Sequence, residues 1–445
     1  MRPGPIAMLA GIVALAVAGG AGVQGAGTAA EAGVEPAPPP AYCRVRPAPA
    51  WPAFTAGGAA PDLTAFQDYR AGLGMGAADR GAGVTIADIE YEWRAGHVEL
   101  APRALAPGDR SGLPSEYRAA EHGTAVLGVL GASEDGRGVT GLVPDATLVP
   151  VSPRISPYQP WQEVTAAAAT LGPGDVILIE LQAGLNAGGA PFAPIEVYPE
   201  MRAAIRAAVD KGIVVVEPAG NGGGDIARLG ELATPAATWL AGPSAPGHSG
   251  ALIVAGGGAG TDETGTGDRR RVPGSNHGAR VDLQGYGAGV VTAGYGDAPW
   301  SPVGDAGYTA CFDGTSSAAA TVAGAVAALQ SAEIARDGTP LTPQRVRDLL
   351  VATGVPQADL ADGWIGPRPS VSAAVAALGD EAVPPPRRPR SPRRRRRVAA
   401  RPSRPRPRCP PAAPPCRRRR PSPRRPSRPP PHARCARPST AARGR

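Results

Sequence analysis

The sequence predicts an α/β protein with a mostly parallel sheet covered by helices on both faces. Its 445 residues are 42% hydrophobic, which is enough for a sizeable core. Short β-branched runs of the kind found in strands buried on both faces recur along the chain, and segments that read as helices separate them. This alternation favours parallel strands with reactive groups at their carboxyl ends. The runs are 84–89, 147–151, 175–181, 213–217 and 252–256.

Helices are predicted between and after these strands, each from its apolar spacing and its terminal residues. In the second of them, Gly212 stands where a helix would stop. The predicted helical segments are 122–131, 199–212, the run after Ser316, and 342–354.

The N-terminus predicts export from the cell. Arg2 precedes 13 uncharged apolar residues at 6–18, followed by small residues suited to cleavage. We therefore expect a signal peptide at 1–28 and a secreted protein; the alternative is a weak membrane anchor over 6–23. Of five cysteines, only Cys43 and Cys311 lie outside the C-terminal tail, so an oxidising compartment would permit a disulfide between them.

The charge of the chain divides it into two unlike parts. Residues 381–445 contain 23 arginines, 19 prolines and one acidic residue, which gives a net charge of +22, whereas the rest carries −14. We expect an N-terminal extension at 29–80, a catalytic domain at 81–379 and a disordered tail at 380–445. The tail is either an arm for nonspecific contact with nucleic acid or anionic envelope surfaces, or a solvated extension without a function.

Four polar residues stand where predicted elements meet loops. Asp88 ends a strand, His122 enters a helix, Asn221 lies in a Gly-rich turn after a strand, and Ser316 begins a helix. Each alone is typical of a cap or a turn. Together they supply the groups that acyl transfer needs: a nucleophile, a base, a carboxylate that orients the base, and an oxyanion donor.

The blocks around these residues resemble those of subtilisin-like serine peptidases over about residues 81–378. The blocks are VTIADIE, HGTAVLGVLG, PAGNGG and GTSSAAATVAG, and the order Asp, His, Ser is that of the subtilisins. The resemblance implies that Ser316 is the nucleophile and that Ser317 is replaceable. It also implies that His122 is the base, that Asp88 orients it, and that Asn221 helps to bind the oxyanion.

Four residues depart from the family pattern beside the expected substrate cleft. They are Glu180, Gln182, Glu217 and Pro218. If Glu180 and Glu217 both flank the first specificity pocket, the enzyme should favour Arg or Lys before the cut. The alternative is that these side chains point away from the cleft or are neutralised by arginines.

The sequence lacks the motifs of zinc peptidases, of α/β-hydrolase esterases and of dinucleotide-binding proteins. HExxH, paired CxxC and GxSxG are absent, and the glycines of GGGAGTDETG do not fit a dinucleotide loop. We expect no required cofactor and no metal in the catalytic site; calcium is possible, although nothing in the sequence supports it. The predicted function is that of a secreted, monomeric serine endopeptidase acting on protein or peptide substrates. The alternative is an inactive subtilisin-like binding scaffold with a polycationic tail.

Overall fold

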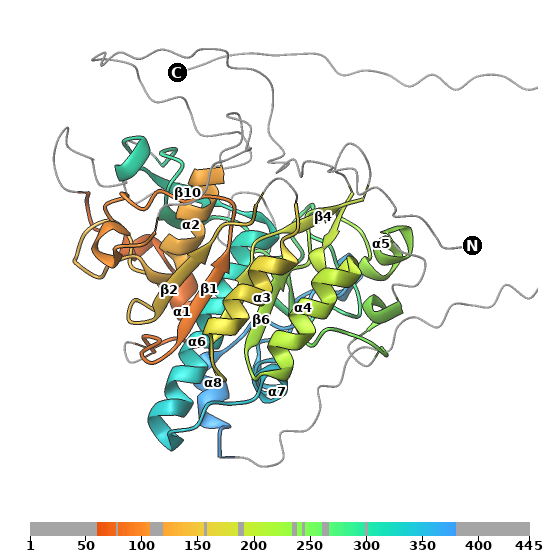
Figure 1. Cartoon of the computed structure of the whole chain (residues 1–445). Coiled ribbons are helices and arrows are strands. Elements are labelled where there is room, and N and C mark those ends of the chain that lie inside the picture. Colours follow the sequence, from red (N-terminus) through yellow and green to blue (C-terminus); the bar gives the residue numbers. More distant parts are fainter. Residues whose placement is uncertain are drawn as a thin grey trace, which may run out of the picture. The chain divides into compact units, whose positions relative to one another are not determined.

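The computed structural model describes residues 60–379 apart from short gaps, and the fold is set out for this part of the chain (Figure 1). The predicted signal peptide or anchor, Cys43 and the arginine-rich tail lie outside the described residues. The gaps are 77–78, 107–118, 155–157, 186–190, 234–237, 243–244, 260–266 and 299–300.

A six-stranded parallel sheet forms the centre, in the order β2-β1-β3-β6-β7-β8. All five predicted strands belong to it, which confirms the predicted fold class. The strands are β1 (Thr85–Ile89), β2 (Thr147–Val151), β3 (Val176–Ile179), β6 (Val214–Pro218), β7 (Leu252–Gly257) and β8 (Leu283–Tyr286).

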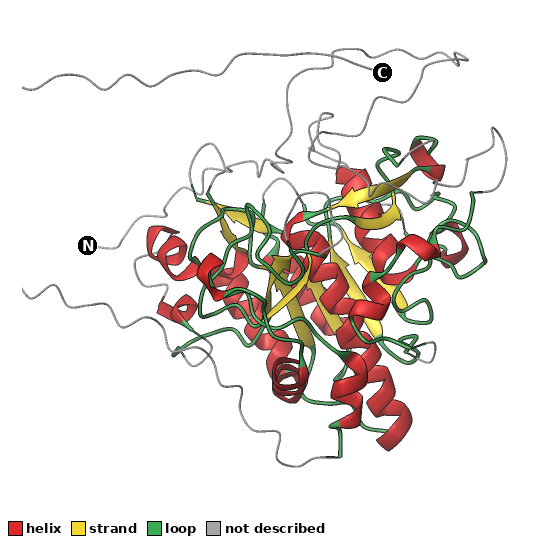
Figure 2. Cartoon of the chain, turned by 180° about the vertical axis from the view of Figure 1, so that it is seen from behind, coloured by secondary structure: helices red, strands yellow, loops and turns green. Residues whose placement is uncertain are grey.

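Helices cover both faces of this sheet. α3 and α4 lie side by side in front of it in Figure 1, and Figure 2 shows the helices of the opposite face. The helices are α1 (Tyr69–Gly72), α2 (Ala119–Gly131), α3 (Trp161–Thr170), α4 (Pro199–Asp210), α5 (Ile226–Ala233), α6 (Gly314–Asp337), α7 (Pro343–Thr353) and α8 (Val371–Ala376).

Alternation along each strand divides the core into two layers. In β1, Ile86 packs into the layer that contains α2 and α6, whereas Ala87 and Ile89 face the layer of α3 and α4. Odd and even positions along a strand therefore face opposite layers. Polar side chains on neighbouring strands can meet at the functional site only if they face the same layer.

Smaller elements surround the sheet. Tyr69 and Leu73, from the segment expected to precede the domain, are buried in the same core as α6. Two antiparallel pairs join β4 (Gln182–Gly184) to β5 (Phe192–Pro194) and β9 (Val290–Ala293) to β10 (Tyr308–Phe312). Short 3-10 helices lie at Thr64–Phe66, Ala101–Arg103, Ile195–Val197, Thr238–Ala241, Gly304–Ala306 and Leu360–Asp362.

The helix α6 is the central helix of the fold. It packs against β3, β6, β7 and β8 and against α2. In length and composition it is the one helix of the described residues that could cross a membrane, with 78% of its apolar window buried inside the protein. Burial of this extent is that of a core helix, whose small residues allow close approach to the sheet.

Candidate active site

His122, on α2, is held by a carboxylate at the carboxyl edge of the sheet. Its Nδ1 donates to Oε2 of Glu90 over 2.5 Å, and both side chains are buried. Because an ionised carboxylate only accepts, this bond places the proton on Nδ1 and leaves Nε2 free to take a proton. The ring of Phe312 packs edge-on against the imidazole at 5.5 Å between centroids.

Gly123 explains how α2 can bring His122 so near β1. A Cβ at this position would lie 2.1 Å from the backbone oxygen of Glu92 and 2.5 Å from Cγ of Glu90. Only glycine leaves room for these atoms, so the His-Gly pair is a packing requirement of the histidine–carboxylate contact.

The contact expected between Asp88 and His122 is not made; Glu90 makes it instead. Both acids face the α2 and α6 layer, but Asp88 lies inside β1 and Glu90 directly follows the strand. Two residues along a strand span about 6–7 Å, so only the later side chain reaches the edge where His122 lies.

Asp88 has an environment unlike that of an orienting acid. Its side chain is fully buried, and neither carboxyl oxygen has a hydrogen-bond partner among the residues that the structure describes. Burial raises the pKa of Asp88 well above its usual range, and the neighbouring Glu90 raises it further. Asp88 is therefore favoured as a neutral acid below the site.

Ser316 lies half-buried in the first turn of α6, as expected for a nucleophile at a helix start. Gly314 begins the helix with a φ of +79°, a conformation that favours glycine. The neighbouring Ser317 is fully buried, and its hydroxyl donates to the Tyr286 carbonyl oxygen over 2.7 Å. Of the two adjacent serines, Ser316 is thus the one available for chemistry.

Asn221 lies next to the start of α6, and its side-chain amide has a fixed orientation. Its Oδ1 accepts from both the backbone N–H and the hydroxyl of Thr315, each at 3.0 Å. Since a backbone N–H can only donate, these bonds assign the oxygen and leave the Nδ2 hydrogens as donors. The Asn221 backbone N–H donates to Oε1 of Gln182 over 2.9 Å, so Gln182 holds the turn that carries Asn221.

Glu180 directly follows β3. The residue is 97% buried, and within the described part of the chain neither carboxyl oxygen has a hydrogen-bond partner. Burial raises the pKa of Glu180 well above its usual range, the charges of Asp88 and Glu90 raise it further, and the nearby Ser316 hydroxyl lowers it in part.

Glu217 does not join Glu180 beside a substrate pocket. It alternates with Val216 and Pro218 along β6, so it faces the α3 and α4 layer on the opposite side of the sheet, where it is fully buried. Burial and the charge of Glu196 raise the pKa of Glu217, and the charge of Arg280 lowers it. The buried Pro218 ends the same strand.

Glu90 is the site residue that the sequence comparison missed. The signal was present as a second acid two residues after Asp88, on the same strand face. The resemblance assigned the orienting role to Asp88 in the block VTIADIE, whereas in the structure Glu90, two residues further along, makes the contact with His122.

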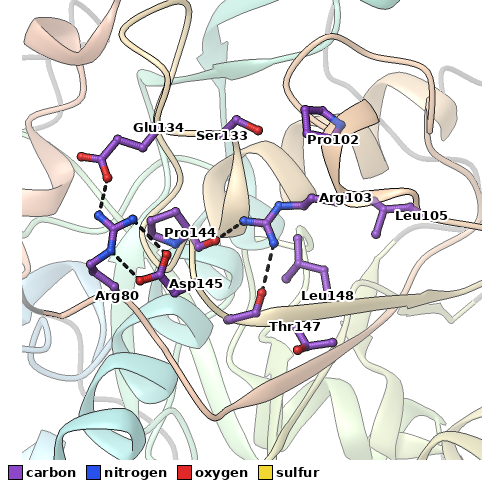
Figure 3. Close-up of a pocket in the computed structure, with 11 residues that line it drawn as sticks. Arg80, Pro102, Arg103, Leu105, Ser133, Glu134, Pro144, Asp145, Thr147 and Leu148 are labelled. Atoms are coloured by element: carbon purple, nitrogen blue, oxygen red, sulfur yellow. Dashed lines mark hydrogen bonds and ion pairs between the residues drawn. The ribbon is translucent and has the colours of Figure 1, made fainter.

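Other features lie apart from these residues. Cys311 is disulfide-bonded, and within the described ranges no group of three or more His, Cys, Asp or Glu side chains could hold a metal ion. A cavity of about 470 Å³ opens near the amino end of β2, away from the catalytic edge (Figure 3). There Arg80 is paired with Glu134 and Asp145, and Arg103 bonds backbone carbonyls.

The site combines a carboxylate-bonded histidine, a half-buried serine in the first turn of a helix and an oriented asparagine amide, which are groups that acyl transfer needs. Residues 106–364 match the model of the subtilase family, more than half of the chain. The chain belongs to the subtilase family. The match begins after β1, so it leaves out the strand that carries Asp88 and precedes Glu90.

Comparison with solved structures found proteases that this chain resembles. A protease from Pseudoalteromonas arctica is 21% identical with a TM-score of 0.50, covering 72% of this chain and 99% of its own. Fervidolysin from Fervidobacterium pennivorans, a keratinolytic enzyme related to subtilisin, is 18% identical with a TM-score of 0.48, covering 69% of this chain and 45% of its own. A comparison with curated proteins gave no match.

Proposed function

We propose that the chain is a secreted serine endopeptidase with Ser316, His122 and Glu90 as its catalytic residues. The observation that carries the proposal is the 2.5 Å bond from His122 Nδ1 to Glu90 Oε2, on the sheet edge where Ser316 begins α6. That bond fixes the tautomer a general base requires. Glu90 takes the role first expected of Asp88.

In the acylation step, Oγ of Ser316 attacks the scissile carbonyl carbon while Nε2 of His122 takes its proton. The carbonyl π electrons move onto oxygen, where the Asn221 side-chain amide and the Ser316 backbone N–H donate to the oxyanion. When the carbon–nitrogen bond breaks, His122 gives the proton to the leaving amine. Water then attacks the acyl carbon while His122 takes its proton, the bond from that carbon to Oγ of Ser316 breaks to release the acid, and His122 returns the proton to Oγ.

The fixed amide of Asn221 supports this assignment. Its carbonyl is occupied by Thr315, so its N–H groups are the part left to meet a substrate oxygen. An Asn221 amide that could rotate freely would stabilise the oxyanion less, because it would first have to be oriented. N–H donors that are already oriented need no reorganisation during the reaction.

We infer that the substrate is a protein or peptide and that the enzyme works outside the cell as a monomer without a required cofactor. The apolar N-terminal run and the disulfide at Cys311 support an oxidising compartment. The corrected place of Glu217 leaves the proposed preference for Arg or Lys without its second carboxylate, so we do not retain it.

Labelling by a fluorophosphonate tests the proposal, because only an activated serine reacts at a useful rate. The wild-type protein and Ser317→Ala should be labelled and Ser316→Ala should not. A wild-type protein that folds yet neither labels nor hydrolyses a casein substrate would instead be an inactive binding scaffold.

A further inference from the structure

The turn that carries Asn221 is held by two buried side-chain amides, and the first of them belongs to Gln182. The Asn221 backbone N–H donates to Oε1 of Gln182 over 2.9 Å, and Gln182, in β4, is only 8% exposed. Because a backbone N–H can only donate, this bond assigns the oxygen of the Gln182 amide to the turn. The Asn221 backbone N–H is occupied in this way, so the donor that Asn221 offers to a substrate oxygen is its side chain.

The second amide, that of Asn276, ties the residues around Asn221 to strand β5. Its Nδ2 donates to the carbonyl oxygens of Phe192 and Ala219 over 2.8 and 2.7 Å, and its Oδ1 accepts from the Gly224 N–H over 2.9 Å. Asn276 is fully buried. Its three bonds therefore fix the two ends of the turn relative to β5.

The turn also packs directly on the backbone of β5. A Cβ at Gly222 would lie 2.4 Å from the Phe192 carbonyl oxygen, and a Cβ at Gly220, whose φ is +92°, would lie 3.1 Å from a backbone carbon of β5. Glycine at these two positions permits the close approach. Packing thus holds the residues on either side, and the bond from Gln182 is the contact that reaches the main chain of Asn221 itself.

Bonds from two directions set where the Asn221 side-chain amide points. Thr315 fixes its rotation through Oδ1, and Gln182 fixes the main chain from which the side chain projects. An oxyanion donor is most effective when it is already in place, because reorganisation during the reaction costs part of the stabilisation. Without the Gln182 oxygen, the Asn221 N–H loses its partner, and a turn that moves to reach water carries the amide away from the oxyanion.

We propose that Gln182 is a positioning residue, which fixes the oxyanion donor Asn221 and so accelerates the chemical step without adding affinity for the substrate. A direct contact with substrate, the role expected from the sequence, would act on affinity instead. The inference rests on the proposed function and adds a supporting residue to that same site.

The test is steady-state hydrolysis of a peptide by wild type and by Gln182→Met, which keeps the length of the side chain but removes the acceptor. The value of kcat should fall about tenfold, as expected for one lost hydrogen bond. KM should change by less than about twofold, because the stabilisation is gained in the transition state. A raised KM with an unchanged kcat would assign Gln182 to substrate contact and overturn the inference.

A double-mutant cycle with Asn221→Ala distinguishes positioning from a general loss of structure. If Gln182 acts through the Asn221 amide, Gln182→Met should lower kcat by less than about twofold once that amide has been removed. Independent effects would multiply instead. A further tenfold loss in the double variant would therefore overturn the inference.

Gln330→Met is the matched control. Gln330 is fully buried, and its Oε1 accepts the Leu341 backbone N–H over 2.9 Å, the same kind of bond at the same length as that of Gln182. It lies roughly 20 Å beyond Ser316 along α6. Gln330→Met should keep the wild-type kcat and KM, and a fall in kcat equal to that of Gln182→Met would overturn the inference.

Failure of the inference and failure of the proposed function give different results. A wild-type protein that neither hydrolyses peptides nor reacts with the fluorophosphonate would overturn the proposed function. An active wild type together with a fully active Gln182→Met would overturn the inference alone.

A second variant keeps the test decisive if thermal unfolding shows that Gln182→Met does not fold. Gln182→Asn retains the amide but withdraws its oxygen from the Asn221 N–H by one methylene. It should show a lower kcat that is again not additive with Asn221→Ala, and a wild-type kcat in Gln182→Asn would overturn the inference.

Discussion

Exchange of Glu90 for glutamine should nearly abolish hydrolysis, although the change removes only a charge. In the folded protein, Tyr91 N–H donates to Glu90 Oε1 over 2.7 Å and His122 Nδ1 bonds Oε2 over 2.5 Å. A backbone N–H can only donate, so the introduced amide must turn its oxygen toward Tyr91. Its NH₂ group then faces His122.

This orientation reverses the tautomer of His122. With an NH₂ donor at Nδ1, the ring carries its proton on Nε2, which can then no longer accept the proton of Ser316. The corresponding wrong tautomer in other serine peptidases costs roughly 10⁴ in kcat. We expect a loss of that order in Glu90→Gln, with KM changed far less, because the carboxylate does not touch the substrate.

The assay is steady-state hydrolysis of a peptide substrate, with Asp88→Asn as the matched control. The Asp88 carboxyl makes no hydrogen bond to any described residue, so its amide variant should retain most of the activity. Thermal unfolding would verify that both variants fold. A fully active Glu90→Gln together with an inactive Asp88→Asn would refute the reasoning and return the orienting role to Asp88.

Three further predictions concern the oxyanion site, the adjacent serine and a buried acid. Asn221→Ala should lower kcat by roughly 10²–10³, measured by steady-state kinetics, whereas a near-normal rate would place the oxyanion donor elsewhere. Ser317→Ala should lower the free energy of unfolding by about 1 kcal/mol, because its bond to Tyr286 is lost, while the labelling of Ser316 continues; equal loss of labelling in both serine variants would contradict the assignment. Burial raises the pKa of Glu99 from 4.5 to about 7, so its proton stabilises the folded state below pH 4.5 and this stabilisation is lost as the pH rises to about 7. Glu99→Gln should remove up to about 3 kcal/mol of that pH dependence, seen as a smaller fall in melting temperature between pH 4.5 and 7, and an unchanged fall would contradict it.

Much of the fold could be predicted because its signals are local. The β-branched runs became β1, β2, β3, β6 and β7, and the helix predicted at 199–212 ends as α4 at Asp210, with Gly212 at a φ of +90°. The helix α3 was not predicted. Its small and polar residues leave only Val164, Ala167 and Ala168 buried, and packing against α4 stabilises it as a helix.

The candidate site was predicted in part for a related reason. His122, Asn221 and Ser316 each lie at the end of an element, and their blocks in the sequence are distinctive. The sequence could not show whether Glu180 and Glu217 flank the same pocket. Both follow apolar runs, but in the structure they lie on opposite faces of the sheet.

The sequence by itself determined the order of strands and helices and the place of the serine, histidine and asparagine at their ends, because periodicity and turn residues act over a few neighbours. Only the tertiary structure decided that Glu90 bonds His122 and that the carboxyls of Asp88 and Glu180 have no hydrogen-bond partner among the described residues. Contacts between carboxyls and catalytic groups depend on strand register and on how closely α2 and α6 approach the sheet. Those distances are set by packing between segments far apart in the chain.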